Sequence, residues 1–408
     1  MGYKKKICIM TEYFPPYIGG GQVNAYEFAK ALGKEFEFHV ITNGLEGCKP
    51  YEIIDNVHIH RIGVIGELRS PWRRFVYVVN AIRVGRKMHR ELDFDLIHAH
   101  VFAGAFAGYI LSKISKIPII CTVHGIHKLR GDAGRFANLW QKIIVGLSYD
   151  AVIAVSKDTE SRILDLGKSP KALVVIPNGV DMEIFHPDEP SRVSLRKRLH
   201  VDNDELLIGF FGRIVRGKGI DILIESMPIV LKHMPNVKLL IMGDGDLKNS
   251  MEERILDLRL DENVMIKNPV PHQEVAQFYC ACDLIVIPSR SEAFSLSALE
   301  AMASGVPLVA SNVGGLREIV HHSDNGWLVE ANSISTLSEA IVKVLSENEL
   351  RHRLIENGVS FVSKRFSWVA LAKHLRDIYL TLIEKSDSTN FVFTNYCVND
   401  LSTIQKRD

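Results

Sequence analysis

The amino-acid sequence predicts an α/β protein with two domains, each built around a parallel β-sheet. The chain has 408 residues, more than one domain usually contains, and 47% of them are hydrophobic, which is enough to form two buried cores. Short apolar runs alternate with amphipathic helical segments, the pattern expected when each strand of a parallel sheet is followed by a helix. Length, composition and alternation therefore agree on one fold class.

The apolar runs fall into two series, separated by the turn-rich segment Pro177-Asn178-Gly179-Val180-Asp181. The first series predicts strands at residues 7–11, 38–42, 57–62, 96–99, 119–123, 152–155 and 173–176. The second series predicts strands at residues 206–211, 237–242, 264–266, 284–287, 306–310 and 327–329. Each series is typical of a doubly wound, Rossmann-like sheet.

The two series define the predicted domains. The N-terminal domain covers residues 1–182 and the C-terminal domain covers residues 183–365. The helical pattern is interrupted at Phe366-Ser367-Trp368, and a last helix at about residues 366–386 is expected to rejoin the N-terminal domain. The polar tail at residues 387–408 has no clear period, so we expect it to be peripheral or disordered.

Several glycine and polar motifs follow directly after predicted strands. They are Gly19-Gly20-Gly21, His124-Gly125, Arg213, Gly243-Asp244-Gly245 and Glu292. Ligands of open α/β sheets bind outside the carboxyl ends of the strands, so two such sheets facing each other form a cleft between these ends. The sequence therefore predicts two Rossmann-like domains facing across a cleft that binds a small molecule.

Two glutamates, Glu292 and Glu300, lie eight positions apart across the predicted start of a helix. The backbone N–H groups of Phe294, Ser295 and Leu296 would lie at the helix N-terminus, which favours an anion such as phosphate. If both glutamates were helical they would be about 12 Å apart along the axis, farther than the roughly 5–9 Å between glycosidase carboxylates. They therefore suit hydroxyl groups at the two ends of one long ligand, such as a nucleotide sugar.

These motifs together resemble the retaining GT-B glycosyltransferases of family 4, over about residues 5–385. The matching segments are Phe14-Pro15-Pro16-Tyr17-Ile18-Gly19-Gly20, Thr122-Val123-His124-Gly125, Ile176-Pro177-Asn178-Gly179-Val180-Asp181, Gly212-Arg213 with Lys218-Gly219, Gly243-Asp244-Gly245, and residues 292–300 continuing through Gly305-Val306-Pro307 to Gly314-Gly315. The resemblance implies a GT-B fold and a hexosyltransferase that retains anomeric configuration. It also implies a UDP- or GDP-sugar donor in the C-terminal domain and an acceptor in the N-terminal domain.

The same resemblance assigns roles to individual residues. The planar guanidinium of Arg213 and the compact ammonium of Lys218 would stabilise the negative charge on the departing diphosphate. Glu292 would contact hydroxyls of the transferred sugar, Glu300 would accept from the donor ribose, and His124 would lie near the anomeric centre. The remaining expected substrate-binding residues are Gly19, Gly20, Asn178, Gly243, Val270, Ala293, Phe294, Ser295 and Leu296. His100 and His127 are expected to be ordinary core or loop histidines.

The acceptor is expected to be a hydroxyl of a glycan, glycolipid or lipid-linked molecule, in polysaccharide or glycolipid biosynthesis. Ala293 stands where glycine is frequent in the family, and the resulting Glu-Ala-Phe segment is similar to that of lipid-directed members. Two alternatives stay open, a nucleotide-sugar 2-epimerase of the same fold and a non-catalytic subunit that binds the donor. The epimerase would require further acid and base groups in the cleft.

No metal ion or other cofactor is expected to take part in the transfer. Of two D-x-D patterns, Asp93-Phe94-Asp95 precedes its strand, at the wrong end for the cleft, and Asp244-Gly245-Asp246 overlaps the glycine loop. Arg213 and Lys218 already supply positive charge for a diphosphate, so a divalent cation is not required.

The charge distribution suggests a membrane contact. Residues 1–182 carry 24 Lys and Arg against 17 Asp and Glu, a net +7, whereas the remainder carries −6. Residues 69–90 combine many basic side chains with Trp72 and Phe75, which fits either a helix on an anionic membrane or a solvated helix face. We expect no signal peptide, because Lys4-Lys5-Lys6 leads into a short strand, and the sequence has no apolar run of the roughly 18–20 residues that a span needs. We therefore expect a cytoplasmic protein, either free in the cytoplasm or peripheral at the cytoplasmic membrane face, that binds no nucleic acid.

Overall fold

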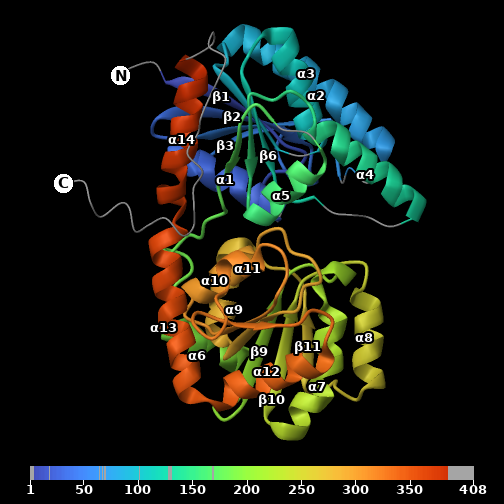
Figure 1. Cartoon of the computed structure of the whole chain (residues 1–408), viewed down its shortest axis with the longest axis vertical. Coiled ribbons are helices and arrows are strands. Elements are labelled where there is room, and N and C mark those ends of the chain that lie inside the picture. The colour runs from blue at the N-terminus through green and yellow to red at the C-terminus, as the bar shows by residue number, and fades with distance from the viewer. Residues whose placement is uncertain are drawn as a thin grey trace, which may run out of the picture. The chain divides into compact units, whose positions relative to one another are not determined.

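The structure is a computed structural model that describes residues 4–17, 19–63, 65–66, 68, 70–100, 102–126, 131–167 and 170–384, without the side chains of residues 131–137 (Figure 1). The predictions for Arg69, for His127 and for the polar tail lie outside these residues. The chain forms two compact units. Unit 1 takes the described residues within Met1–Asn178 and Trp368–Asp408, and unit 2 is Gly179–Ser367.

Unit 1 contains an eight-stranded sheet in its described part, with strand order β3-β4-β2-β1-β5-β6-β7-β8. The strands are β1 Lys5–Met10, β2 Phe36–Asn43, β3 Tyr51–Ile54, β4 Val57–Ile62, β5 Leu96–His100, β6 Ile119–Val123, β7 Ala151–Ala154 and β8 Leu173–Val175. Strand β1 is central, with Ile7 paired to Phe38 on one side and Leu96 on the other. All neighbours run parallel except β3 and β4.

Helices cover both faces of this sheet. They are α1 Gly20–Leu32, α2 Pro71–Leu92, α3 Ala103–Ser115, α4 Gly131–Val145, α5 Lys157–Asp165 and α14 Trp368–Glu384. Helix α14 packs beside α1, where the rings of Phe28 and Trp368 are 5.0 Å apart, and its Tyr379 ring lies 5.5 Å from Phe36. On the opposite face, α2 and α3 bury Tyr77 against a core that includes Ile41. The last helix therefore belongs to unit 1, about 190 residues after the chain leaves it.

Unit 2 contains a six-stranded, fully parallel sheet with strand order β11-β10-β9-β12-β13-β14. Its strands are β9 Leu206–Phe211, β10 Val237–Met242, β11 Val264–Lys267, β12 Leu284–Ile287, β13 Leu308–Ser311 and β14 Trp327–Val329. In sequence order this is 3-2-1-4-5-6, the Rossmann arrangement, in which the strand order reverses between β9 and β12. The ligand crevice of such a sheet lies outside the carboxyl ends at this reversal.

The helical elements of unit 2 pack on this sheet. They are α6 Glu189–Arg198, the 3₁₀ turn η1 Arg216–Lys218, α7 Ile220–His233, α8 Lys248–Asp257, α9 His272–Ala281, α10 Leu296–Ala303, α11 Leu316–Ile319, α12 Ile334–Ser346 and α13 Asn348–Arg365. The buried face of helix α12 follows from its sequence, because the apolar residues Leu337, Ile341 and Val344 recur at helical spacing. Ser333 caps this helix by accepting from the backbone N–H of Thr336.

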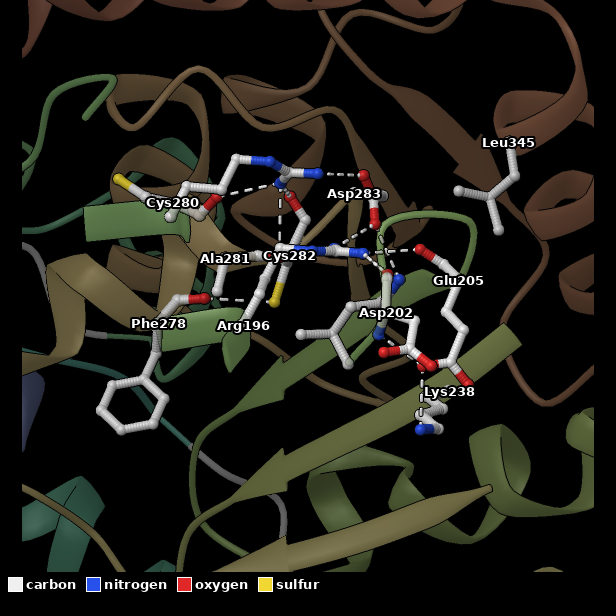
Figure 2. A network of polar contacts seen from close by, with 12 residues as sticks. Arg196, Asp202, Glu205, Lys238, Phe278, Cys280, Ala281, Cys282, Asp283 and Leu345 are labelled. Atoms are coloured by element: carbon white, nitrogen blue, oxygen red, sulfur yellow. Dashed lines mark hydrogen bonds and ion pairs between the residues drawn. The ribbon is translucent and has the colours of Figure 1, made fainter. Parts of the chain in front are cut away.

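A polar network at the amino end of this sheet fixes α6 to it (Figure 2). Asp283 precedes β12, and its carboxylate accepts from Arg192 at 2.6 Å, from Arg196 at 3.0 Å and from the backbone N–H of Leu207 at 2.8 Å. Arg196 is 6% exposed and also donates to the carbonyl oxygen of Glu205 at 2.6 Å. Each charge here has partners, as buried ions require.

The predicted fold class is confirmed, with two parallel-sheet, Rossmann-like units. Within the described residues one strand was missed, β3, which pairs antiparallel to β4 at the edge of unit 1 and exposes 48% of Tyr51 and 54% of Ile53. An exposed edge strand lacks the apolar run by which buried parallel strands are recognised. The predicted division at residues 182 and 183 lies four residues beyond the division between the two units, after Asn178.

Candidate active site

Glycine loops at the carboxyl ends of β9, β10 and β12 pack directly on one another. A Cβ atom at Gly243 would lie 1.9 Å from the carbonyl oxygen of Gly212, and one at Gly219 would lie 1.9 Å from that of Pro288. Gly219 also has a φ of 69°, a left-handed conformation that favours glycine. These contacts explain the spacing of glycines seen in the sequence, and they hold three strand ends in fixed relation.

Two cations are presented by the loop after β9. Arg213 is exposed, and within the described residues its side chain has no hydrogen-bond or ion-pair partner. Lys218 lies in the turn η1, and its Nζ is 2.6 Å from Oε2 of Glu292. The hydroxyl of Ser289 also donates to Oε2 of Glu292, at 3.0 Å. The sequence prediction that Arg213, Lys218 and Glu292 belong to one unit agrees with these positions, and the direct pairing of Lys218 with Glu292 is new.

Arg290 hydrogen-bonds to this loop and forms an ion pair with Asp221 of α7. Its guanidinium contacts both carboxylate oxygens of Asp221, at 2.6 and 2.7 Å, and donates to the carbonyl oxygen of Arg216 at 2.7 Å. Its backbone N–H donates to the carbonyl oxygen of Gly217 at 2.9 Å. Burial raises the pKa of Asp221, but the hydrogen bond and charge of Arg290 outweigh it and hold that pKa below its ordinary value. Sequence reasoning missed Arg290, although it follows a strand end as the chosen motifs do.

Glu292 lies in a loop rather than in a helix, because α10 begins at Leu296. The 12 Å estimate assumed that both glutamates were helical, and that assumption was wrong. The loop is held by Gly314 and Gly315, since the N–H of Gly315 donates to the carbonyl oxygen of Glu292 at 2.9 Å. A Cβ at Gly314 would lie 2.0 Å from that same oxygen. Helix α10 has no side-chain cap at its N-terminus, which leaves its first N–H groups without a side-chain acceptor.

Glu300 is buried in α10 and is hydrogen-bonded by two residues of α9. Nε2 of His272 is 2.8 Å from its Oε1, and the hydroxyl of Tyr279 donates to its Oε2 at 2.8 Å. Burial, together with the neighbouring carboxylate, raises the pKa of Tyr279 well above its ordinary value, so the phenol keeps its proton and remains a donor. Nothing in the local sequence indicated these two partners, because they lie more than twenty residues away.

The predicted residues of unit 1 meet at the start of α1. Gly19 is the N-cap residue of α1 and makes no side-chain cap hydrogen bond, and Gly20 is the first helical residue. Close approach occurs at Gly21, where a Cβ would lie 2.9 Å from Cδ2 of His124. A side chain at Gly21 would therefore displace the ring of His124, and the expected substrate-binding roles of Gly19 and Gly20 stay predictions.

His124 is one of a row of histidines in unit 1. Its Nε2 is 2.8 Å from Nδ1 of His100, and its buried Nδ1 has no hydrogen-bond partner in the described part of the chain. Burial lowers the pKa of His124 to about 4, so the ring is neutral at neutral pH. Burial also lowers the pKa of His100 well below its ordinary value. His100 thus fits the expected core role, but it is also the direct support of His124.

The other predicted residues occupy varied positions. Asn178 is buried, and its Oδ1 accepts from Nδ2 of Asn24 at 2.8 Å. The amide oxygen of Asn178 therefore already has a hydrogen-bond partner within the protein. Val270 is half-buried in the loop after β11, and Ala293 is half-buried in the glutamate loop. Phe294 and Ser295 are buried beside it. Their roles as substrate-binding residues stay predictions.

The D-x-D patterns do not form a metal cluster. Asp95 lies at the amino end of β5, where its carboxylate pairs with Lys5 at 2.9 Å and accepts from the N–H of Lys6 at 2.7 Å. Asp244 accepts from the N–H of its neighbour Gly245 at 2.9 Å. Among the described residues, neither pattern belongs to a group of three metal-ligating side chains.

Comparisons with known proteins agree with this geometry. Residues 191–361 match the family Glycosyl transferases group 1, and residues 18–184 match Glycosyltransferase Family 4. An uncharacterized glycosyltransferase of Methanocaldococcus jannaschii is 30% identical over 399 residues, covering 93% of this chain and 99% of the relative. A D-inositol 3-phosphate glycosyltransferase of Xylanimonas cellulosilytica is 29% identical over 389 residues, covering 88% and 91%.

Solved structures share the fold. Sucrose-phosphate synthase from Thermosynechococcus elongatus has a TM-score of 0.82 at 22% identity, covering 93% of this chain and all of that one. Anabaena HepE in complex with UDP-glucose has a TM-score of 0.77 at 22% identity, covering 92% and 99%. The fold and the strand-end site define a glycosyltransferase of the GT-B class. The chain belongs to glycosyltransferase family 4, as its relatives and its two matched regions show.

Proposed function

We propose that the protein transfers a sugar, with retention of anomeric configuration, from UDP- or GDP-sugar to a hydroxyl of a glycan, glycolipid or lipid-linked acceptor. The observation that carries this proposal is the pair of cations after β9: Arg213 is exposed with no side-chain partner in the described part of the chain, and Lys218 pairs with Glu292. Positive charge on a glycine-lined strand end suits a diphosphate. HepE was solved with UDP-glucose, which supports a uridine nucleotide sugar as the first donor to test.

The proposed reaction uses these groups as follows. The bond between the anomeric carbon and the diphosphate oxygen breaks, and the acceptor oxygen bonds to the same face of that carbon. The acceptor proton passes to the departing diphosphate, whose growing negative charge is stabilised by Arg213 and Lys218. Glu292 holds hydroxyls of the transferred sugar, and when it does so Lys218 is released toward the phosphate. Glu300, oriented by His272 and Tyr279, holds the ribose.

His124 is proposed to act as a neutral hydrogen-bonding group near the anomeric centre. Its pKa of about 4 keeps the ring uncharged, and His100 fixes one of its nitrogens, whereas the buried Nδ1 has no hydrogen-bond partner among the described residues. A neutral imidazole can accept from or donate to a sugar hydroxyl without opposing positive charge that develops on the sugar. The transfer itself is proposed to need no metal ion.

A panel of UDP-, GDP- and ADP-sugars tests the function, with release of the free nucleotide measured for each. We expect slow hydrolysis of one donor in water and faster release when the acceptor is added. Arg213→Ala is the control, because nucleotide release by a contaminating hydrolase would persist in it. Formation of an epimeric sugar without transfer would instead establish the 2-epimerase, and binding without any turnover would establish a donor-binding subunit.

The acceptor is proposed to be reached at a membrane surface through helix α2. Trp72 is 69% exposed and Phe75 is 57% exposed, and their rings stack 5.6 Å apart at the start of this helix. The exposed basic side chains along it are Arg74, Arg83, Arg86, Lys87 and Arg90. Aromatic rings beside basic side chains suit the interface of an anionic membrane. In the described part of the chain, no helix is long and apolar enough to cross a bilayer.

Sedimentation with phosphatidylserine- or phosphatidylinositol-containing vesicles tests the membrane contact. Arg73→Glu/Arg74→Glu should reduce binding, by about 1 kcal/mol for each basic side chain near the surface. The control is Lys232→Glu/Arg353→Glu, which makes the same change of charge at exposed positions of unit 2. If all three proteins stay in the supernatant at low salt, a soluble acceptor is the better interpretation, and a sugar phosphate would be tried first because a relative is a D-inositol 3-phosphate glycosyltransferase.

A further inference from the structure

Strands β2 and β4 of unit 1 bring one carboxylate and two imidazoles together. Glu37 and His39 are two positions apart on β2, so they share a face of the sheet. His58 lies on β4, in register with His39, and neighbouring strands are about 4.8 Å apart. Among the described residues this is the one group of three such side chains whose ligand atoms all lie within 4.8 Å of one another.

We propose that Glu37, His39 and His58 bind a divalent transition metal ion of the zinc type. Two imidazoles and a carboxylate are a common protein donor set for zinc, with the fourth position left to water. Oε1 of Glu37 and Nε2 of His39 are already 2.8 Å apart, sharing a proton. Metal binding replaces that proton by the ion, with a small separation of the two atoms, and releases the proton to solvent.

The outer ring nitrogens of both histidines already have partners. Nδ1 of His39 is 3.2 Å from Nε2 of His60, and Nδ1 of His58 is 2.8 Å from the hydroxyl of Tyr51. A histidine that binds a metal through one nitrogen needs a partner for the proton on the other, because that contact fixes the ring and its tautomer. The cluster therefore supplies outer partners as well as ligands, which distinguishes it from a chance group of surface histidines.

Exposure also fits an ion site. Glu37 and His58 are half-buried, which leaves solvent access for the ion and for a water ligand. The rings of His39 and His58 stack with centroids 4.6 Å apart, and one ligand atom from each of the three residues already lies within 4.8 Å of the other two.

The site is separate from the proposed transfer chemistry. Glu37 is the second residue of β2, near the amino end of the sheet, whereas Gly21 and His124 follow carboxyl ends. An ion held by β2 and β4 joins the outer strands β4 and β3 to the centre of the sheet. Its role is structural, and the transfer reaction does not depend on it.

Titration of the chelator-treated full-length protein with Zn²⁺ and Co²⁺ tests the proposal, by calorimetry and by the visible absorption of tetrahedral Co²⁺. We expect one equivalent to bind. Glu37→Gln and His58→Gln should each weaken Zn²⁺ binding by about a hundredfold or more, and Tyr51→Phe by about tenfold, as loss of an outer partner does. His352→Gln, which removes an exposed histidine of α13, should bind as wild type does.

Thermal unfolding separates loss of the site from loss of the fold. Zn²⁺ should raise the melting temperature of the wild type and of His352→Gln, because an ion that binds only the folded state stabilises it. Zn²⁺ should not change the melting temperature of a folded His58→Gln variant. Binding to His58→Gln as tight as to wild type would assign the ion to another ligand such as the free thiol of Cys48 and would overturn the proposal. Absence of saturable binding to the wild type would overturn it as well.

Discussion

The two ends of the unit 2 sheet use the same residue types in opposite ways. At the amino end, Arg196 is buried and hydrogen-bonded, and Asp283 joins two arginines and a backbone N–H (Figure 2). At the carboxyl end, Arg213 is exposed and has no side-chain partner among the residues that the structure describes, and Lys218 has Glu292 as a partner that a ligand can replace. Saturated charges hold a fold together, whereas unsaturated or exchangeable charges are available to a substrate.

The largest effect is expected from breaking the amino-end network. Asp283→Ala leaves two arginines without their carboxylate, and breaking a buried pair in this way costs about 3–5 kcal/mol. Urea unfolding measures the loss, with Glu225→Ala as the control. Glu225 pairs with the half-exposed Arg254, and such a surface pair contributes about 1 kcal/mol or less. Equal free energies of unfolding for the two variants would show that the amino-end network contributes no more to stability than a surface ion pair.

Acid should destabilise unit 1 through its buried histidines. Burial lowers the pKa of His98 to about 3 and of His60 and His124 to about 4, whereas the same groups titrate near 6.5 in the unfolded chain. Between these values the unfolded chain binds more protons, so the free energy of unfolding falls as pH is lowered from about 6.5 to 4. The slope should approach about 1.4 kcal/mol per pH unit for each histidine.

Denaturant unfolding at pH 7, 6, 5 and 4 measures this slope. His98→Gln should reduce it, because one of the titrating groups is removed. The exposed histidine of α13 provides the control, since His352→Gln should leave the slope unchanged. A free energy of unfolding that stays constant from pH 6.5 to 4 would mean that these histidines are protonated in the folded protein.

At the carboxyl end, Glu300→Gln should weaken donor binding by about tenfold while changing kcat little. Its two oxygens accept from His272 and Tyr279, and a glutamine amide would oppose one of these donors. A contact made equally in ground and transition states changes KM rather than kcat. Steady-state kinetics measure both constants, with Glu339→Gln, an exposed glutamate of α12, as the control. A drop in kcat alone would place Glu300 at the reacting centre instead.

Chelation should have the smallest effect on transfer. The cations of the carboxyl end supply the charge that a divalent ion would otherwise bring, so activity should survive EDTA. The measurement compares initial rates with EDTA, with added Mg²⁺ and with added Mn²⁺. If EDTA abolishes transfer and Mg²⁺ or Mn²⁺ restores it, Asp244 and Asp246 become candidate ligands.

The sequence predicted the fold class well because buried parallel strands are continuous apolar runs. Every strand of unit 2 was anticipated, and β3, the one strand missed among the described residues, is an exposed edge strand. The rule that ligands bind at strand carboxyl ends also selected Arg213 and Glu292, because each follows a strand closely in sequence. Lys218 was selected by the resemblance to the family.

Tertiary partners could not be predicted in the same way. His272 and Tyr279 reach Glu300 from another helix, and Arg290 reaches Asp221 across 69 positions. The metal-binding cluster was missed for a similar reason, since His39 and His58 meet only through strand register. Local spacing shows which face or strand end a residue occupies, but not which side chain of another element lies opposite.

The central claim is that Arg213 and Lys218 stabilise the leaving diphosphate, and turnover of their alanine variants tests it most directly. Arg213→Ala and Lys218→Ala should each lower kcat by roughly a hundredfold or more, as loss of a preorganised charge contact does. Arg213→Ala should unfold in urea as the wild type does, whereas Lys218→Ala should fold but be less stable, because it leaves the buried Glu292 without its cation. Arg216→Ala removes an exposed charge from the same turn and should retain nearly full turnover. Near-normal turnover of the Arg213 and Lys218 variants, or an equal loss in Arg216→Ala, would contradict the claim.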